Sequence, residues 1–210
     1  MDILASYRED PCGTLSIPYW KNKHVHIPGN MRILHDREFQ PALYPEYQDD
    51  PYFRLLHPLV DIPAPTPGGI SIVTATPEDI PHFADIINRS YTDLSVTDRQ
   101  LMRYTQTEVF CSELWIAAVD DNTSRMVGCG IADLDTELQE GIIEWVQVLP
   151  DWRGKGIGQL IVTELLRRMS GRAEFATVSG KVNALTAPEK LYRKCGFAGE
   201  DIWHVLTRKD

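Results

Sequence analysis

A glycine-rich turn between an apolar strand and an apolar helix limits the folds open to this chain more than any other feature. Residues 142–148 read Ile-Ile-Glu-Trp-Val-Gln-Val, which is typical of a buried strand, and Pro150 ends it because proline donates no ladder hydrogen bond. Gly154, Gly156 and Gly158 follow, and apolar residues then recur at helical spacing. The chain therefore enters the helix through backbone that carries few side chains.

Such a turn is suited to binding a pyrophosphate. The first amides of a helix have no partner within the helix, and they point outwards at its positive end. Two basic side chains add positive charge, so we predict that six consecutive residues hold a diphosphate: Arg153, Gly154, Lys155, Gly156, Ile157 and Gly158. The alternative is a glycine-softened helix start with two solvated basic residues.

Two other phosphate-binding motifs do not fit this turn. Residues 154–159 read Gly-Lys-Gly-Ile-Gly-Gln, which lacks the third glycine of the dinucleotide fingerprint G-x-G-x-x-G. Too little chain follows to build the second half of a dinucleotide-binding fold. The P-loop requires Gly-Lys-Ser/Thr, which is absent here.

The turn resembles motif A of the GCN5-related N-acetyltransferase (GNAT) superfamily, Gln/Arg-x-x-Gly-x-Gly/Ala, with Arg153, Gly156 and Gly158 in the defining positions. Residues 191–197, Leu-Tyr-Arg-Lys-Cys-Gly-Phe, resemble the Leu-Tyr-x-x-x-Gly-Phe end of a later motif of the same superfamily. One strand and one helix separate the two stretches in the predicted element order, as the resemblance requires. The resemblance covers residues 70–208.

The resemblance implies a fold, a cosubstrate and a mechanism. The fold is α/β, with a mixed, mostly antiparallel central sheet that is flanked by helices and splays open beside the strand at 142–148. Backbone groups of Val146 and Val148 would bind the pantetheine arm of acetyl-CoA, and an amine would attack the thioester directly. Asn183 is a weaker candidate for a coenzyme contact, because the superfamily often has its asparagine where this chain has Leu185.

A carboxylate on the strand at 142–148 is the candidate general base. An amine with a pKa near 10.4 is almost fully protonated at pH 7, so a base would assist its attack. We expect Glu144 to share a strand face with Ile142, Val146 and Val148, which would partly desolvate its carboxylate and raise its pKa. A solvent-facing or ion-paired Glu144 is the alternative, and three rival carboxylates lie nearby: Asp133, Asp135 and Glu113.

Tyr192 is the candidate general acid. The resemblance places its hydroxyl near the coenzyme sulfur, where it would protonate a leaving thiolate whose pKa resembles that of cysteine, about 8.5. The alternative is a core residue of a short helix that packs beside Leu191 and Phe197.

The remaining pattern predicts a mixed α/β domain over residues 68–210. Thr76-Pro-Glu-Asp79 carries an N-cap, a proline at the first helical position and a capping-box carboxylate, so a helix begins there. We predict strands over 70–75, 113–120, 126–132, 142–148, 175–182 and 202–206, and further helices over 97–110, 156–169 and 188–194.

Residues 1–67 have a different composition. They contain ten of the fourteen prolines and eight of the nineteen aromatic residues, which disfavours long helices but offers apolar surface to bury. We expect an ordered extension that wraps the 68–210 domain and ends in a semi-rigid linker at 61–69. Trp20 and the N-terminal tyrosines are candidates for a cover over the acceptor site.

Charge and cysteine usage restrict the partners. The net charge of −9 opposes nucleic-acid binding, no segment reads as a membrane span, and the four scattered cysteines favour reduced thiols and a cytoplasmic location. His24 and His26 lack a clear third ligand, so no metal is expected. The expected partner is a small-molecule or peptide amine, and a homodimer is an arrangement that the sequence permits.

The sequence therefore predicts an acetyl-CoA-dependent N-acetyltransferase that acts on a primary amine in a ternary complex. The alternative is a non-catalytic acyl-CoA sensor or interaction module, in which the coenzyme turn persists and the acid–base residues are silent.

Overall fold

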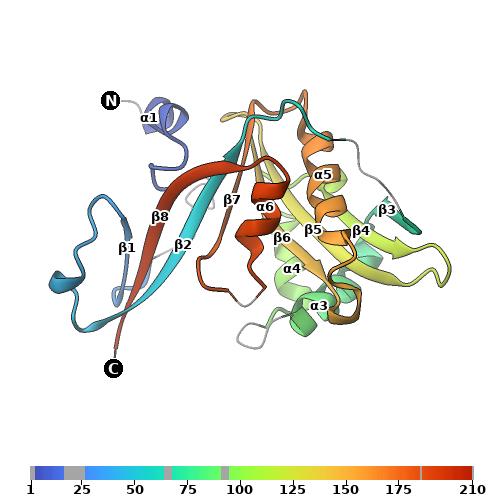
Figure 1. Cartoon of the computed structure of the whole chain (residues 1–210), viewed down its shortest axis with the longest axis horizontal. Helices are drawn as coiled ribbons and strands as arrows, with labels where there is room; N and C mark the ends of the chain where they lie inside the picture. The colour runs from blue at the N-terminus through green and yellow to red at the C-terminus, as the bar shows by residue number, and fades with distance from the viewer. Residues whose placement is uncertain (1–2, 17–26, 64–67, 91–94, 185, 210) are drawn as a thin grey trace.

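Eight strands form one mostly antiparallel sheet. A computed structural model describes residues 3–16, 27–63, 68–90, 95–184 and 186–209 of the chain. The strands lie in the order β1-β8-β2-β7-β6-β5-β4-β3, and of the described pairs only β6 and β7 run parallel (Figure 1). Their bounds are β1 Met31–His35, β2 Tyr47–His57, β3 Ile70–Thr74, β4 Trp115–Asp120, β5 Met126–Asp135, β6 Glu140–Val148, β7 Phe175–Lys181 and β8 Ala198–Arg208. The predicted fold class is confirmed.

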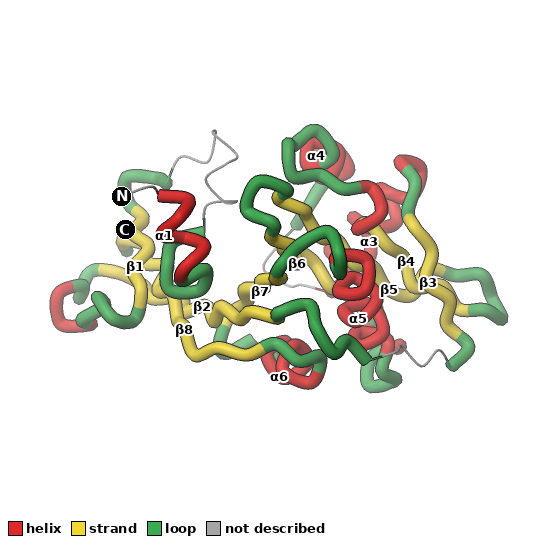
Figure 2. The backbone as a smooth tube through the Cα atoms, turned by 90° about the horizontal axis from the view of Figure 1, so that it is seen from above, coloured by secondary structure: helices red, strands yellow, loops and turns green. Residues whose placement is uncertain are grey.

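Helices cover both faces of this sheet. On one face, α5 and α6 pack against a cluster that includes Ile143 and Val178. On the opposite face, α3 and α4 pack against Trp115 and Ile131, and α1 covers one end of β6 and β7 (Figure 2). The helix bounds are α1 Ile3–Glu9, α3 Ile80–Ser90, α4 Asp98–Tyr104, α5 Ile157–Met169 and α6 Pro188–Lys194.

Local sequence signals set several of these bounds. The predicted helix at 188–194 is α6, and the predicted strand at 142–148 lies within β6. The amide of Thr76 donates to Asp79 Oδ2 at 2.8 Å, so the predicted capping box forms and opens the short 3₁₀ turn before α3.

The helix predicted over 97–110 is too long, because α4 ends at Tyr104. The hydroxyls of Thr105 and Thr107 donate to the carbonyls of Met102 and Tyr104, at 2.8 and 2.9 Å. Such local bonds compete with the helical pattern, so the two threonines favour a turn at this point.

Residues before position 67 supply two strands of the sheet. β2 lies between β7 and β8, and β1 pairs with the other edge of β8. The sheet therefore continues across the boundary predicted at residue 67, and β8 is longer than the predicted strand at 202–206 because it has partners on both sides. Pro51 is tolerated in β2 because the ladder with β7 ends beside it, at the pair of Tyr52 and Lys181.

A buried polar cluster ties α1 to the sheet. The Tyr7 hydroxyl donates to Glu140 at 2.8 Å and accepts from Arg54 Nη2 at 2.7 Å. The Arg54 guanidinium also lies 3.4 Å from Glu140, and Thr177 donates to the same carboxylate. Burial raises the pKa of Glu140, while Arg54 and the two hydroxyls favour its ionised form. A cluster that joins four segments of the chain thus fixes the N-terminal helix.

We predict that Arg54→Met lowers the free energy of unfolding by about 3–5 kcal/mol, because it leaves the buried Glu140 carboxylate without its cation. Chemical denaturation measures the change. Arg8→Met is the matched control, since it removes an exposed ion pair between α1 and Glu174 and should cost less than about 1 kcal/mol. Equal losses in the two variants would contradict a structural role for the buried cluster.

Candidate active site

Strands β6 and β7 part in the middle of the sheet. Their parallel pairing ends at Ile143 and Val178, and residues 145–148 of β6 pair only with β5. The amide of Leu149 donates to Val127 on β5 at 2.9 Å, so by the alternation of an antiparallel strand the backbone groups of Val148 and Val146 point away from β5. The sheet opens where the resemblance implied, and backbone groups of β6 face the opening.

One of these backbone groups is already occupied. The Val148 carbonyl accepts a hydrogen bond from Arg153 Nε at 3.0 Å. The Val148 amide and both backbone groups of Val146 have no partner on that side among the described residues. These three groups are available to an extended ligand, whereas the guanidinium of Arg153 is held against the strand.

The turn before α5 leaves a row of amides without acceptors. Arg153 N donates to Pro150 O at 3.2 Å, and Leu160 N donates to Gly156 O at 3.0 Å. Between them, the amides of residues 154–159 have no acceptor within the described part of the chain. Gly156 is the N-cap of α5 with φ of 81°, a conformation in which a side chain is disfavoured. The predicted phosphate seat is therefore open.

Contacts around the turn explain why residue 158 is a glycine and where the charge of Lys155 lies. A Cβ atom at Gly158 would lie 3.1 Å from Leu191 Cδ2, so glycine allows α6 to pack closely against the start of α5. Lys155 Nζ lies 4.4 Å from the centroid of the Trp152 ring, which holds its charge beside the free amides.

An extra residue in β6 changes the direction of Glu144. Ile131 of β5 pairs with Trp145, and Ala132 pairs with Ile143, so Glu144 has no direct partner and forms a bulge. The bulge interrupts the strand alternation that the sequence pattern assumes.

The prediction that Glu144 shares a strand face with Ile142, Val146 and Val148 is therefore wrong in part. Val146 and Val148 pack with Ile143 against the α5 face. Glu144 follows Ile142 by two residues on the opposite face, which also carries α3 and α4. Glu144 thus shares a face with Ile142, as predicted, but not with the two valines.

A second carboxyl group lies beside Glu144. Asp133 pairs with Ile142 across β5 and β6, which puts its side chain on the same face as Glu144. Solvent reaches Glu144 at the opening, yet the surrounding strands crowd its carboxylate, and this desolvation raises its pKa. Desolvation and the charge of Glu144 raise the pKa of Asp133 to about 8. At neutral pH the pair therefore retains at least one proton.

Residues 111–198 match the family profile of the acetyltransferase (GNAT) domain. This segment, less than half of the chain, is similar to a GNAT domain. The matched segment includes the opening, the glycine turn, both carboxyl groups and Tyr192. Comparison with curated proteins gave no match.

Solved structures share the fold at low sequence identity. A GCN5-related N-acetyltransferase from Sphaerobacter thermophilus superposes with a TM-score of 0.67 at 21% identity, over 85% of this chain and 60% of that protein. A fungal GCN5-related glucosamine N-acetyltransferase region gives 0.60 at 16%, over 76% of this chain and 21% of that protein. The ribosomal-protein-S18-alanine N-acetyltransferase from Escherichia coli gives 0.53 at 16%, over 66% and 93%. The chain thus spans less than two thirds of the first two proteins.

Two rival carboxylates within residues 111–198 have structural roles elsewhere. Asp135 Oδ1 accepts the amides of Glu137 and Leu138, both at 3.0 Å, and so shapes a turn. Glu113 accepts from Cys111 Sγ at 3.1 Å in a 3₁₀ turn outside the opening. Of the three rivals, Asp133 alone lies beside Glu144.

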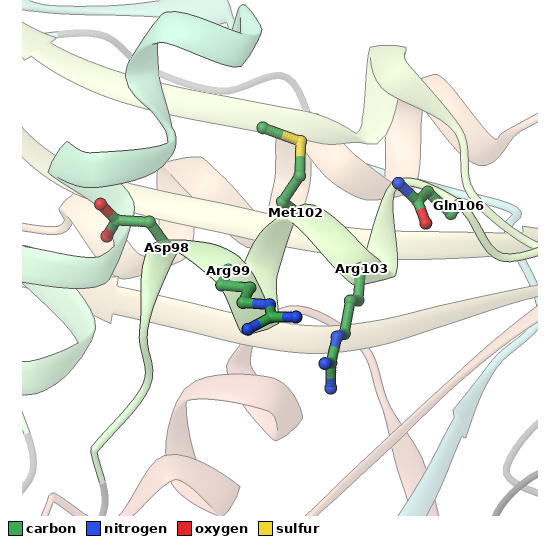
Figure 3. Close-up of a pocket in the computed structure, with 5 residues that line it drawn as sticks. All are labelled: Asp98, Arg99, Met102, Arg103 and Gln106. Atoms are coloured by element: carbon green, nitrogen blue, oxygen red, sulfur yellow. The ribbon is translucent and has the colours of Figure 1, made fainter.

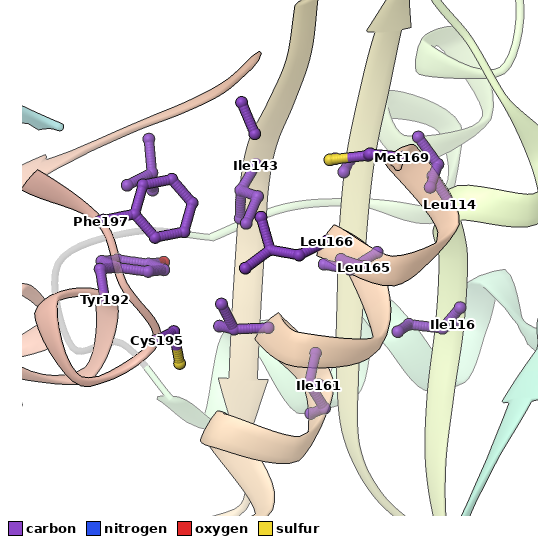
Figure 4. Close-up of a cluster of buried hydrophobic side chains, with 14 of the residues drawn as sticks. Leu114, Ile116, Ile143, Ile161, Leu165, Leu166, Met169, Tyr192, Cys195 and Phe197 are labelled. Atoms are coloured by element: carbon purple, nitrogen blue, oxygen red, sulfur yellow. The ribbon is translucent and has the colours of Figure 1, made fainter. Parts of the chain in front are cut away.

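Tyr192 is buried on α6 in the cluster shown in Figure 4. Its ring lies 6.2 Å from that of Phe53 and 5.7 Å from that of Phe197, between centroids. These contacts fit the packing interpretation, and the role as an acid stays a prediction. Asn183 is exposed beyond the end of β7, and its role also stays a prediction. Leu185, Trp20, His24 and His26 lie outside the described residues.

Other surface features contribute little to this site. Figure 3 shows a shallow hollow along one exposed side of α4, lined by Asp98, Arg99, Met102, Arg103 and Gln106. It includes none of the predicted site residues. The described residues contain no cluster of ligands suited to a metal ion, and none of the described helices is long and apolar enough to cross a membrane.

We predict that Asp133→Asn flattens the pH dependence of stability. Folded Asp133 keeps its proton up to about pH 8, whereas an unfolded aspartate loses it near pH 4. The folded state therefore binds more protons in this window, and its stability falls as the pH rises from about 4 to 8. Denaturation at pH 5 and pH 8 should show a smaller loss in the variant than in the parent. Asp85→Asn, an exposed change on α3, is the control, and a parent-like loss in Asp133→Asn would refute the shift.

Proposed function

We propose that this protein is an acetyl-CoA-dependent N-acetyltransferase that transfers an acetyl group to a primary amine within a ternary complex. The row of free amides over residues 154–159, next to the opening between β6 and β7, carries this proposal. The GNAT family match supports it, since this family acetylates amines with acetyl-CoA.

The residues present fit a thioester of coenzyme A. The free amides, the positive end of α5 and Lys155 would hold the diphosphate. The backbone groups of Val146 and the amide of Val148 would pair with the amides of the pantetheine arm, as an added strand would. Both features lie along one path from the turn to the bulge, so the acetyl group would lie near Glu144.

The reaction then requires one proton to leave the amine and one to reach sulfur. The amine nitrogen attacks the thioester carbonyl carbon, the N–C bond forms, and the C–S bond breaks with its electron pair on sulfur. Glu144 accepts the proton from nitrogen, and Tyr192 donates a proton to the thiolate. Asp133, protonated at neutral pH, prevents the pair from carrying two negative charges.

The proposed acceptor is a primary amine on either a small molecule or a peptide. The structural neighbours include a region that acts on glucosamine and an enzyme that acts on the alanine of a ribosomal protein. Both a small-molecule amine and a peptide amine therefore suit the fold.

Titration with acetyl-CoA, followed by a thiol-release assay over spermidine, glucosamine, an alanyl peptide and lysine methyl ester, tests the proposed function. We predict turnover with at least one amine, and a kcat that Glu144→Gln lowers by about 10²- to 10⁴-fold, because the base is lost. Glu108→Gln is the exposed control. Binding of acetyl-CoA without thiol release from any amine would contradict the proposal and favour a sensor.

We predict that Gly156→Val weakens coenzyme binding by at least tenfold. The left-handed conformation at this N-cap is costly for a β-branched residue, by about 1–2 kcal/mol or more, so the turn would rearrange and its amides would lose their alignment. Calorimetry with coenzyme A measures the affinity, and thermal melting checks the fold. Gly29→Val serves as control, since Gly29 has open space around it and no left-handed φ. Unchanged affinity in a folded Gly156→Val protein would remove the diphosphate seat.

A further inference from the structure

Ser179 is exposed although it lies on a central strand of the sheet. β7 has β6 on one side and β2 on the other, and the residues before Ser179, Thr177 and Val178, are buried. Val178 is the last residue of β7 that pairs with β6. Ser179 is therefore the first residue of β7 at the opening.

Ser179 and Glu144 occupy matching places on the two strands. The last parallel pair joins Ile143 to Val178, and Glu144 and Ser179 each come one residue after this pair. Ser179 shares its face with Thr177, and Glu144 shares its face with Ile142, which is paired with Thr177. The hydroxyl and the carboxylate thus flank the start of the opening on one face.

Arg54 orients the Ser179 hydroxyl from behind. The two residues are paired across β2 and β7, and Arg54 Nη1 donates to Ser179 Oγ at 3.4 Å. The other guanidinium nitrogens are held elsewhere, with Nε 3.0 Å from Pro11 O and Nη2 2.7 Å from the Tyr7 hydroxyl. Arg54 is therefore fixed in place.

One lone pair of the hydroxyl stays unused. A serine oxygen has two acceptor positions, and Arg54 takes one of them. Within the described residues Ser179 has no other partner, and its side chain is exposed. A ligand N–H between Ser179 and Glu144 would fill the second position.

We propose that Ser179 contacts the acceptor nitrogen opposite Glu144 and selects primary over secondary amines. This inference rests on the proposed function. A neutral primary amine has two N–H groups and one lone pair: one N–H goes to Glu144, the other to Ser179 Oγ, and the lone pair attacks the thioester. A secondary amine has a single N–H, which the base requires, so Ser179 is left without that bond.

The test compares each accepted primary amine with its N-methyl derivative in the parent, Ser179→Ala and Ser179→Thr. The parent should prefer the primary amine. Ser179→Ala should lower kcat/KM for the primary amine by about 3- to 10-fold, as one hydrogen bond is lost, and leave the N-methyl amine unchanged. The KM for acetyl-CoA should stay as in the parent. Ser179→Thr keeps the hydroxyl and should retain the preference.

Controls separate this inference from the proposed function. Ser71→Ala, on the exposed face of β3, should change none of these values. A parent-like ratio of primary to N-methyl amine in Ser179→Ala overturns the role of Ser179 while the proposed function stands. A parent that releases no thiol contradicts the proposed function. In that case, calorimetry with coenzyme A present measures how tightly each primary amine and its N-methyl derivative bind. If the parent and Ser179→Ala bind the amines with equal affinity, the role of Ser179 is overturned.

Discussion

The separation of β6 from β7 after Ile143 and Val178 is the constraint on which the rest of the site depends. Paired strands satisfy each other's backbone groups, so a sheet that parts in its middle leaves polar groups that need another partner. Here the unpaired stretch of β6 leads directly into the glycine turn, where the helix start adds a second set of unpaired amides. Two neighbouring rows of donors and acceptors thus lie along one length of chain. The bulge at Glu144 falls at the same point and directs a carboxylate to the face opposite α5. The proposed coenzyme-binding groups and the proposed catalytic carboxylate are therefore consequences of one interruption in strand pairing.

The N-terminal segment belongs to this arrangement through Arg54. Its guanidinium forms an ion pair with Glu140 and donates hydrogen bonds to the hydroxyls of Tyr7 and Ser179. The charge of Arg54 favours the ionised forms of Glu140 and Glu144, against the desolvation that raises the pKa of both groups. The pKa of Glu144 therefore depends in part on a residue from a strand that the sequence pattern did not reveal.

Local patterns were sufficient for much of the fold. The glycines of the turn and the capping residue Thr76 each act within a few residues, so the sequence predicts the elements they bound. Strand β2 was missed because its place between β7 and β8 depends on partners more than a hundred residues away. The bulge was missed for a related reason, since it is defined by the register with β5. Glu144 could thus be identified as a candidate from its strand, and Asp133 as one of three rivals nearby, but neither the direction of Glu144 nor the place of Ser179 followed from the spacing.

The position of β8 bears on how the chain acquires its structure. β1 and β2 are synthesised early, yet both pair with β8, at residues 198–208. Until that stretch is available, β1 lacks its described partner strand and β2 can pair only with β7. Contacts of such sequence separation are slow to form. The sheet around Arg54 is thus completed only when β8 joins it, and a chain interrupted before β8 would expose one edge of β2.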